Sequence, residues 1–229
     1  MDKSVKKISE MFDEIAGTYD ILNHSFTLNL DQKWRKQIVK YIKKNSIKFD
    51  TVLDIASGTG DLTKALLKLD SKVIYATDIS PKMLEVQKKK FKDERLKIEV
   101  ADALNLPFKS NSIDIVTIGF GVRNFENLEK GLKEIHRVLK KGGYLIVLEM
   151  FGNKGFKKKI FDLYFGKIMP KVGNRVSGSK HAYSYLFNSV KNFHSVEEFV
   201  KLAESRGYKE KERVNNFLDF VFTTYLEKT

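Results

Sequence analysis

The stretch Asp54-Ile-Ala-Ser-Gly-Thr-Gly-Asp61 decides the fold of this 229-residue chain. It overlaps the end of a short apolar run, 51–55, that is typical of a buried β-strand, and it precedes residues 62–69, whose apolar side chains recur at helical spacing. The glycines of the turn permit a tight bend and close approach of a ligand to the backbone, although purely structural turns also use glycine in this way. The stretch therefore predicts a strand, a glycine-rich turn and a helix in succession.

The same alternation continues along the chain. We predict further strands at 72–78, 96–100, 113–120, 144–150, 208–214 and 220–226, and helices at 4–19, 33–44, 128–139 and 195–207, with another helix beginning at Pro81. The run Lys140-Lys-Gly-Gly143 is expected to end the helix 128–139. This order predicts an α/β fold with a doubly wound, seven-stranded, mostly parallel sheet. We expect one domain over 1–229, with a helical cover at 1–48 and a helical, substrate-side insertion at 151–195 after the fifth strand.

The composition narrows the classes of protein. The chain has no cysteine, which excludes disulfides, cysteine-based zinc sites and cysteine nucleophiles. It has no apolar stretch long enough to span a membrane and no apolar segment near Met1 that would serve as a secretory signal, so we expect a cytoplasmic protein. The net charge of +13 leaves three interpretations open, which are nucleic acid binding, contact with an anionic membrane and an ordinary solvated lysine surface.

Three acidic residues stand at the ends of successive predicted strands. Asp54 ends the first strand, Asp78 ends the second, and Asp102 follows the third. Each acid alone also suits a helix cap or a turn, but open α/β sheets bind ligands at the carboxyl ends of their strands, where all three meet. An acid at the position of Asp78 can accept the ribose hydroxyls of an adenosine, and Asp102 can meet the adenine amino group.

Two classes of nucleotide cofactor compete for this site. A dinucleotide requires a third glycine and a helix N-terminus free to hold a pyrophosphate, which the charge of Asp61 would repel, and a P-loop requires a Gly-Lys-Ser/Thr sequence that is absent. Acids suit the sulfonium and ammonium of S-adenosylmethionine (AdoMet), which we therefore predict as the cofactor, with no metal. The predicted cofactor-binding residues are Asp54, Ser57, Gly58, Thr59, Gly60, Asp78, Ile79, Asp102, Ala103 and Gly119.

Several motifs give the chain a specific resemblance. They are Phe12-x-x-Ile-Ala-x-x-Tyr-Asp20, Trp34-Arg35, Gly58-Thr-Gly-Asp-Leu62, Phe120-Gly-Val-Arg-Asn124, Arg137-Val-Leu-Lys-x-Gly-Gly143 and Ser184-Tyr-Leu186 with Ser189. Together they resemble the ubiquinone/menaquinone biosynthesis C-methyltransferases, within the class I AdoMet-dependent methyltransferases. The resemblance runs from about residue 12 to residue 207. It implies a Rossmann-like fold, and an activity that methylates a ring carbon of a polyprenylated hydroquinone.

The resemblance also implies which residues meet the cofactor. Family members bind AdoMet through the positions of Thr59, Asp78, Asp102 and Ala103, and many use a serine where this chain has Gly119. A second departure lies near the C-terminus, where the family's His-Arg-Gly is replaced by Phe-Thr-Thr-Tyr at 222–225.

We predict three catalytic residues beside the methyl end of the cofactor. Arg123 is expected to stabilise a phenolate or polarise a water, Asn124 to hydrogen-bond a ring oxygen, and Tyr19 to close over the site. A surface ion pair between Arg123 and Glu126 is the structural alternative. His181 is a weaker candidate for substrate contact.

The aromatic, lysine-rich insertion suits both an apolar prenyl tail and an anionic membrane, through Lys154, Lys157, Lys158 and Lys159. We therefore expect an apolar small-molecule substrate and peripheral contact with the inner membrane face, and we leave a homodimer open. Methylation of another apolar molecule or of RNA, and a non-catalytic AdoMet-binding accessory role, remain alternatives. An RNA target is disfavoured because amino-group methylation usually needs an Asn/Asp-Pro-Pro-aromatic motif where this chain has 119–124.

Overall fold

A computed structural model describes residues 3–152 and 182–229. Its seven strands form one sheet in the order β3-β2-β1-β4-β5-β7-β6. The strands are β1 (Thr51–Ile55), β2 (Val73–Asp78), β3 (Leu96–Val100), β4 (Ile113–Gly119), β5 (Leu139–Met150), β6 (Tyr208–Phe217) and β7 (Val221–Lys228). β1 to β5 are parallel, whereas β7 runs antiparallel to both β5 and β6. The predicted seven-stranded, mostly parallel sheet is confirmed.

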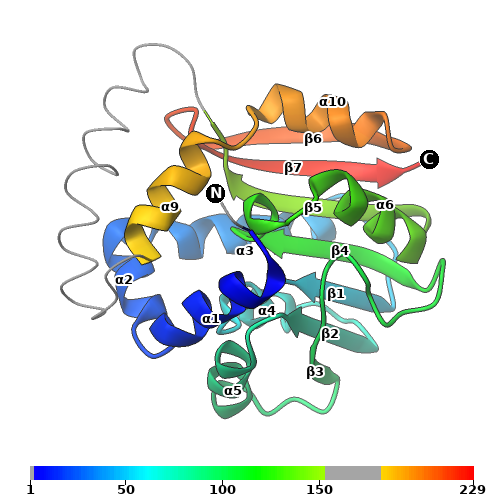
Figure 1. Cartoon of the computed structure of the whole chain (residues 1–229). Coiled ribbons are helices and arrows are strands. Elements are labelled where there is room, and N and C mark those ends of the chain that lie inside the picture. The colour runs from blue at the N-terminus through cyan, green and yellow to red at the C-terminus, as the bar shows by residue number, and fades with distance from the viewer. Residues whose placement is uncertain (1–2, 153–181) are drawn as a thin grey trace.

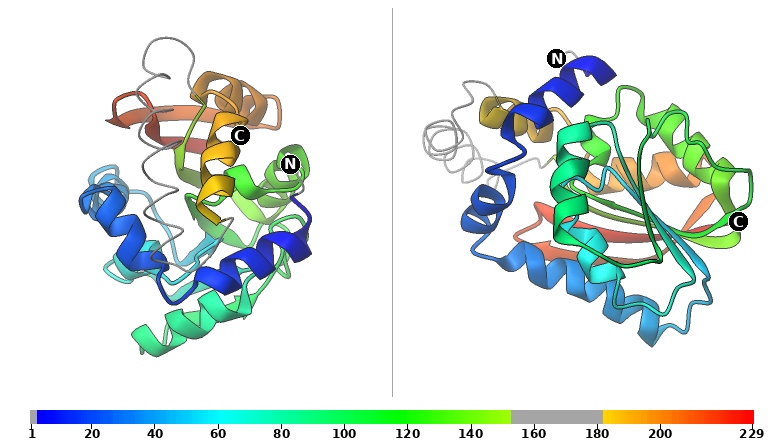
Figure 2. Two further views of the ribbon diagram at one scale, coloured as in Figure 1. Left: turned by 60° about the vertical axis from the view of Figure 1, so that its left-hand side comes forward. Right: turned by 90° about the horizontal axis from the view of Figure 1, so that it is seen from below.

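Helices pack on both faces of this sheet (Figure 1). The helical elements are α1 (Val5–Ile15), α2 (Tyr19–Phe26), α3 (Leu30–Lys44), α4 (Asp61–Leu66), α5 (Pro81–Lys90), η1 (Val122–Asn124), α6 (Leu128–Val138), α9 (Ala182–Lys191) and α10 (Val196–Glu204). α3 and α4 cover one face through a core that includes Ile38, Ile42 and Leu66, and α6 and α10 cover the other through Leu132, Ile135 and Phe199 (Figure 2).

The central strands are buried on both faces, and their sequences show it. In β4 the side chains from Ile115 to Ile118 are all fully buried, because the strand lies between β1 and β5 with helices on either side. A strand of this kind has no polar alternation, so its apolar run predicts it well. Because β3, β2, β1 and β4 are parallel neighbours in the sheet, their carboxyl ends lie side by side at one edge.

Several boundaries differ from the prediction by about three residues, and two differences change an element. The predicted helix 4–19 stops at Ile15, and α2 begins separately at Tyr19 after the Gly17 turn. Lys140 to Gly143 does not form a turn between helix and strand, because β5 already begins at Leu139. The register against β4 shifts between Ile113 and Ile115, so these residues lie in an irregular part of β5, where Gly142 adopts φ +75°.

The helical cover lies across the carboxyl edge of the sheet. Figure 1 shows α1, α2 and α9 gathered on the side to which β1 and β4 point. α1 packs on α5 through a small core of Ile15, Ala16, Leu22 and Met83. Of the predicted insertion, Lys154, Lys157 to Lys159 and His181 lie outside the described residues. No helix within 3–152 and 182–229 combines the length and the apolar character that crossing a membrane requires.

Candidate active site

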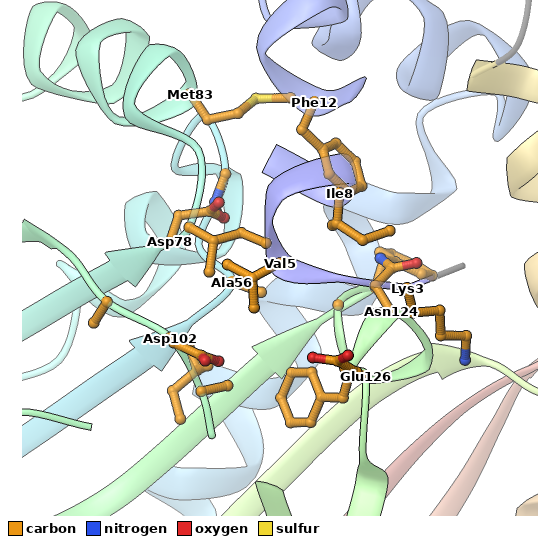
Figure 3. Close-up of a pocket in the computed structure, with 18 of the residues that line it drawn as sticks. Lys3, Val5, Ile8, Phe12, Ala56, Asp78, Met83, Asp102, Asn124 and Glu126 are labelled. Carbon is orange, nitrogen blue, oxygen red and sulfur yellow. The ribbon is translucent and has the colours of Figure 1, made fainter. Parts of the chain in front are cut away.

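A cavity lies at the carboxyl edge of the sheet beneath α1, and it encloses about 720 Å³ when the space open to solvent is included. Figure 3 shows Asp78 and Asp102 projecting into it from the ends of two neighbouring strands, with Val5 and Ile8 of α1 to one side of them. Among the predicted site residues, those that line it are Tyr19, Gly58, Asp78, Ile79, Asp102, Ala103, Gly119 and Asn124.

Asp78 is fixed by its own turn. The backbone N–H of Gly58 donates to one carboxylate oxygen and that of Ser80 to the other, each at 2.8 Å. The side chain is nearly buried, and burial raises its pKa to about 6 against the opposing pull of these N–H donors. Since each carboxylate oxygen has further acceptor capacity, Asp78 presents a fixed pair of acceptors to the cavity.

Asp102 and Gly58 frame the cavity on either side of Asp78. The N–H of Leu104 donates to Asp102 Oδ1 at 2.9 Å, and Oδ2 accepts no hydrogen bond from the described residues. Gly58 has φ +55°, and a Cβ placed on it would meet no heavy atom within 4 Å. The missing side chain therefore leaves open space at a residue that lines the cavity.

Four other predicted cofactor residues, in β1 and the turn after it, are not among the residues that line the cavity. Asp54 is fully buried and accepts hydrogen bonds from Thr63 and Thr117 at 2.6 and 2.8 Å, which ties α4 to β1 and β4. Burial raises the pKa of Asp54 to about 6, although these hydroxyls oppose the shift. Ser57 donates to Gln87 of α5 at 3.0 Å. The structure therefore gives Asp54 and Ser57 a structural role and does not place them in the cavity.

Gly60 and Thr59 also face away from the cavity. A Cβ on Gly60 would lie 2.5 Å from Phe91 Cε2, so glycine is required there by packing against α5. The Thr59 hydroxyl donates to Asp20 of α2, and Lys90 of α5 bonds to both Asp20 and the Thr59 carbonyl. Thr59 thus joins the loop to the cover, a connection that sequence spacing does not reveal.

Asp61 is held by Arg35 and His24 of the cover. Its carboxylate lies 3.8 Å from Arg35 of α3 and 3.4 Å from His24 of α2. Arg35 and His24 also meet Asp31, so the guanidinium supplies positive charge to this carboxylate cluster. The acid that was expected to face a bound cofactor instead fastens α2 and α3 to the start of α4.

The turn after β4 rests on a buried ion pair. Arg123 bonds to Glu149 at 2.7 Å, to the Phe120 carbonyl at 2.6 Å and to Ser189 at 3.2 Å. Its partner is Glu149 of β5, not Glu126 as the structural alternative assumed. Glu149 is fully buried, and burial raises its pKa although Arg123 counters the shift. Arg123 is not among the residues that line the cavity, and its contacts hold the turn in place, so its catalytic role stays a prediction.

Asn124 and Tyr19 do reach the cavity. The Tyr185 hydroxyl of α9 donates to Asn124 Oδ1 at 3.1 Å, which orients the amide group. Burial raises the pKa of Tyr19, while Arg123, Arg35 and a hydrogen bond with Asn23 oppose the rise. Tyr19 is therefore a neutral hydroxyl at neutral pH.

Sequence reasoning missed the apolar wall and one polar partner. Val5, Ile8, Phe12 and Met83 line the cavity from α1 and α5. The sequence predicted a helix at this position, but only the fold shows what its apolar side chains cover. Glu149 carried a signal of its own, since it is an acid within the otherwise apolar run 145–150.

Comparison with known proteins identifies the family. The model of the ubiE/COQ5 methyltransferase family matches residues 1–221. The chain belongs to the ubiE/COQ5 methyltransferase family. It is 39% identical to the demethylmenaquinone methyltransferase of Chlorobaculum parvum, across 92% of this chain and 88% of that one. It is also 39% identical to the ubiquinone/menaquinone biosynthesis C-methyltransferase UbiE of Campylobacter jejuni, across 89% and 90% of the two chains.

A solved structure agrees with this family assignment. A proposed S-adenosyl-L-methionine-dependent methyltransferase of Methanococcus maripaludis superimposes with a TM-score of 0.65 at 26% identity, over 95% of this chain and 94% of that one. The predictions of a class I methyltransferase fold and of a methyltransferase of this family are confirmed. The assignment of individual residues to cofactor and substrate stays a prediction.

Proposed function

We propose that this ubiE/COQ5 family member transfers the methyl group of AdoMet to a ring carbon of a prenylated hydroquinone. One observation carries the proposal, which is that Gly58, Asp78 and Asp102 converge on a single cavity at the carboxyl ends of β1, β2 and β3. The two relatives named above support a demethylmenaquinol-like substrate.

The lining of the cavity fits an adenosine. Asp78 is positioned to accept both ribose hydroxyls, because its two oxygens are already fixed by backbone donors and retain acceptor capacity. Asp102 Oδ2 is available to the adenine amino group. Ile79 and Met83 supply apolar surface for the base, and the open space at Gly58 lets the ligand lie against the backbone.

The other end of the cavity fits a substrate ring. When bound, AdoMet supplies an electrophilic methyl group on its sulfonium. Because Asn124 Oδ1 accepts from Tyr185, its amide N–H groups are free to donate to a ring oxygen and to stabilise a phenolate. The Tyr19 hydroxyl is a second neutral donor on the cover side. Both contacts orient the ring, and alignment of reacting atoms is a large part of what such an enzyme contributes.

The cover limits the contact of the cavity with water. Val5, Ile8 and Phe12 of α1 form an apolar wall over the cavity, and Asp20 holds the cover to the loop through Thr59 and Lys90. A dry site favours a carbon nucleophile over hydrolytic side reactions. Since Val5 and Ile8 of α1 line the same cavity as Asp78 and Asp102, we expect α1 to shift when cofactor enters.

Methyl-labelled AdoMet tests the proposal. Purified protein is incubated with a reduced, prenylated naphthoquinone that lacks the ring methyl, or with total RNA, and the label in each fraction is counted. We expect label in the lipid only, and a loss of AdoMet binding and turnover in Asp78→Ala. Asp50→Ala, which removes an exposed carboxylate far from the cavity, is the matched control. Label in RNA, or in neither fraction despite AdoMet binding, would contradict the proposal.

A further inference from the structure

The exposed face of α3 carries five lysines. Lys33, Lys36, Lys40, Lys43 and Lys44 are all exposed, and they recur at helical spacing. The only acid of this helix, Asp31, is buried against Arg35. None of the five lysines has an ion-pair partner within the part of the chain that the structure describes.

Lys68 of α4 extends this surface. A shallow groove between the two helices is lined by Lys36, Lys40, Lys43, Lys44 and Lys68. We call these six lysines together the basic face: Lys33, Lys36, Lys40, Lys43, Lys44 and Lys68. Like charges three and four residues apart repel each other on a helix, and within the described residues no acidic side chain pairs with these lysines. An external anionic surface would supply it.

Exposed apolar side chains lie at one end of the basic face. Ile21 and Leu28 are seven residues apart on α2 and the turn that leads into α3, with 67% and 80% of their surfaces exposed. Leu218, 57% exposed, is at the tip of the β6–β7 hairpin. We call Ile21, Leu28 and Leu218 the apolar tips.

The hairpin and the α2–α3 turn lie at the same end of α3. Phe217, beside Leu218, has its ring 6.3 Å from that of Trp34, which is in the second turn of the helix (Figure 2). Leu28 and Leu218 both have a left-handed backbone, with φ of 51° and 44°. That conformation is costly for leucine, and neither side chain gains burial within the described protein in return.

We infer that the basic face and the apolar tips dock this protein onto an anionic lipid bilayer. The lysines would face the headgroups, and the three apolar side chains would enter the boundary between headgroups and acyl chains. Nucleic acid would neutralise the same lysines, but its phosphate backbone offers no apolar phase to exposed leucines. The two features together therefore favour lipid.

This surface goes beyond the proposed reaction, since it is formed by α3, α4 and two exposed turns and not by the cavity. It would bring the enzyme to the phase in which a prenylated molecule is dissolved. Its evidence is independent of the identity of the substrate.

Co-sedimentation with vesicles tests the inference. Wild-type protein is mixed with vesicles of phosphatidylcholine alone or of phosphatidylcholine with phosphatidylglycerol. We expect binding only to the anionic vesicles, and weakening by salt. In Lys36→Gln/Lys40→Gln/Lys43→Gln, partitioning should fall about fivefold per lysine, or about 100-fold in total.

A matched variant separates this surface from net charge. It removes three exposed lysines from α6 and α10, on the opposite face of the sheet: Lys130→Gln, Lys133→Gln and Lys201→Gln. We expect it to bind vesicles nearly as the wild type does. Equal loss of binding in both triple variants would overturn the inference, as would binding to duplex RNA through the α3 lysines without binding to vesicles.

The apolar tips have their own variant. Leu218→Gly places the residue that best tolerates φ of 44° at the hairpin tip, so the fold should be as stable as the wild type or more stable. Vesicle binding should nevertheless fall several-fold, because an inserted side chain is lost. Unchanged vesicle binding would show that the tips do not enter lipid. Neither AdoMet nor a quinol is present in these assays, so their failure is distinct from failure of the proposed reaction.

Discussion

Gly58 and Gly60 are two residues apart in one turn, and their alanine variants should fail in different ways. Both have a left-handed backbone, with φ of +55° and +94°. Gly58 lines the cavity, and a methyl group on it would meet no heavy atom within 4 Å, whereas one on Gly60 would lie 2.5 Å from Phe91 and 2.7 Å from Gln87. The Gly58 variant should therefore lose ligand affinity, and the Gly60 variant should lose stability.

The expected magnitudes follow from these contacts. The left-handed backbone costs alanine about 1–2 kcal/mol at either position. Gly60→Ala adds overpacking of about 1–3 kcal/mol against α5. Since a chain of this size loses about 2–4 °C of melting temperature per kcal/mol, Gly60→Ala should melt several degrees below Gly58→Ala in the absence of ligand.

Cofactor affinity should show the reverse order. In Gly58→Ala the methyl group overlaps the space proposed for AdoMet, and overpacking of about 1–3 kcal/mol corresponds to binding that is about 5- to 150-fold weaker. Gly60→Ala, titrated well below its melting temperature, should bind nearly as the wild type does. Scanning fluorimetry and isothermal titration calorimetry measure the two quantities. Near-normal AdoMet affinity in a folded Gly58→Ala would refute the assignment of the cavity.

Two further predictions concern the buried carboxylates. Arg123→Met leaves Glu149 buried without its partner and should lower the free energy of unfolding in urea by about 3–5 kcal/mol. Arg123→Met/Glu149→Leu should recover most of that loss. A double variant that folds stably yet has no turnover would show that Arg123 is needed for catalysis. Asp54 has a pKa of about 6 in the fold, above its ordinary value near 4, so the native state binds the proton more tightly and stability falls as pH rises between these values. The wild type should therefore lose up to about 3 kcal/mol relative to Asp54→Asn between about pH 4 and pH 7, measured by urea unfolding, and parallel pH profiles would show that Asp54 does not carry this loss.

The sheet could be predicted from the sequence because its central strands are apolar on both faces. The apolar runs of β1, β4 and β5 and the helical spacing between them settle the order of elements. The predicted helix boundaries were less accurate around α2, a short helix whose buried residue is Leu22. They were also less accurate where β5 continues through the glycines at 142 and 143.

Sequence position placed acids at the right edge but did not show which way each one points. Asp78 is the last residue of β2 and turns into the cavity, whereas Asp54 is followed by Ile55 within β1 and points to Thr63. In a strand that is buried on both faces, no polar alternation marks this difference. Likewise Arg123 and Glu149 meet because β4 and β5 are neighbours, a contact across 26 residues that local spacing cannot reveal.

The central claim is that a ring carbon receives the methyl group. It is tested most directly with a prenylated naphthoquinol that carries deuterium on the vacant ring carbon, incubated with the enzyme and AdoMet and then analysed by mass spectrometry. We expect a product that has gained one methyl group and lost the deuterium, because the new carbon–carbon bond replaces the carbon–deuterium bond. A methylated product that retains the deuterium would place the methyl group on oxygen and contradict the account.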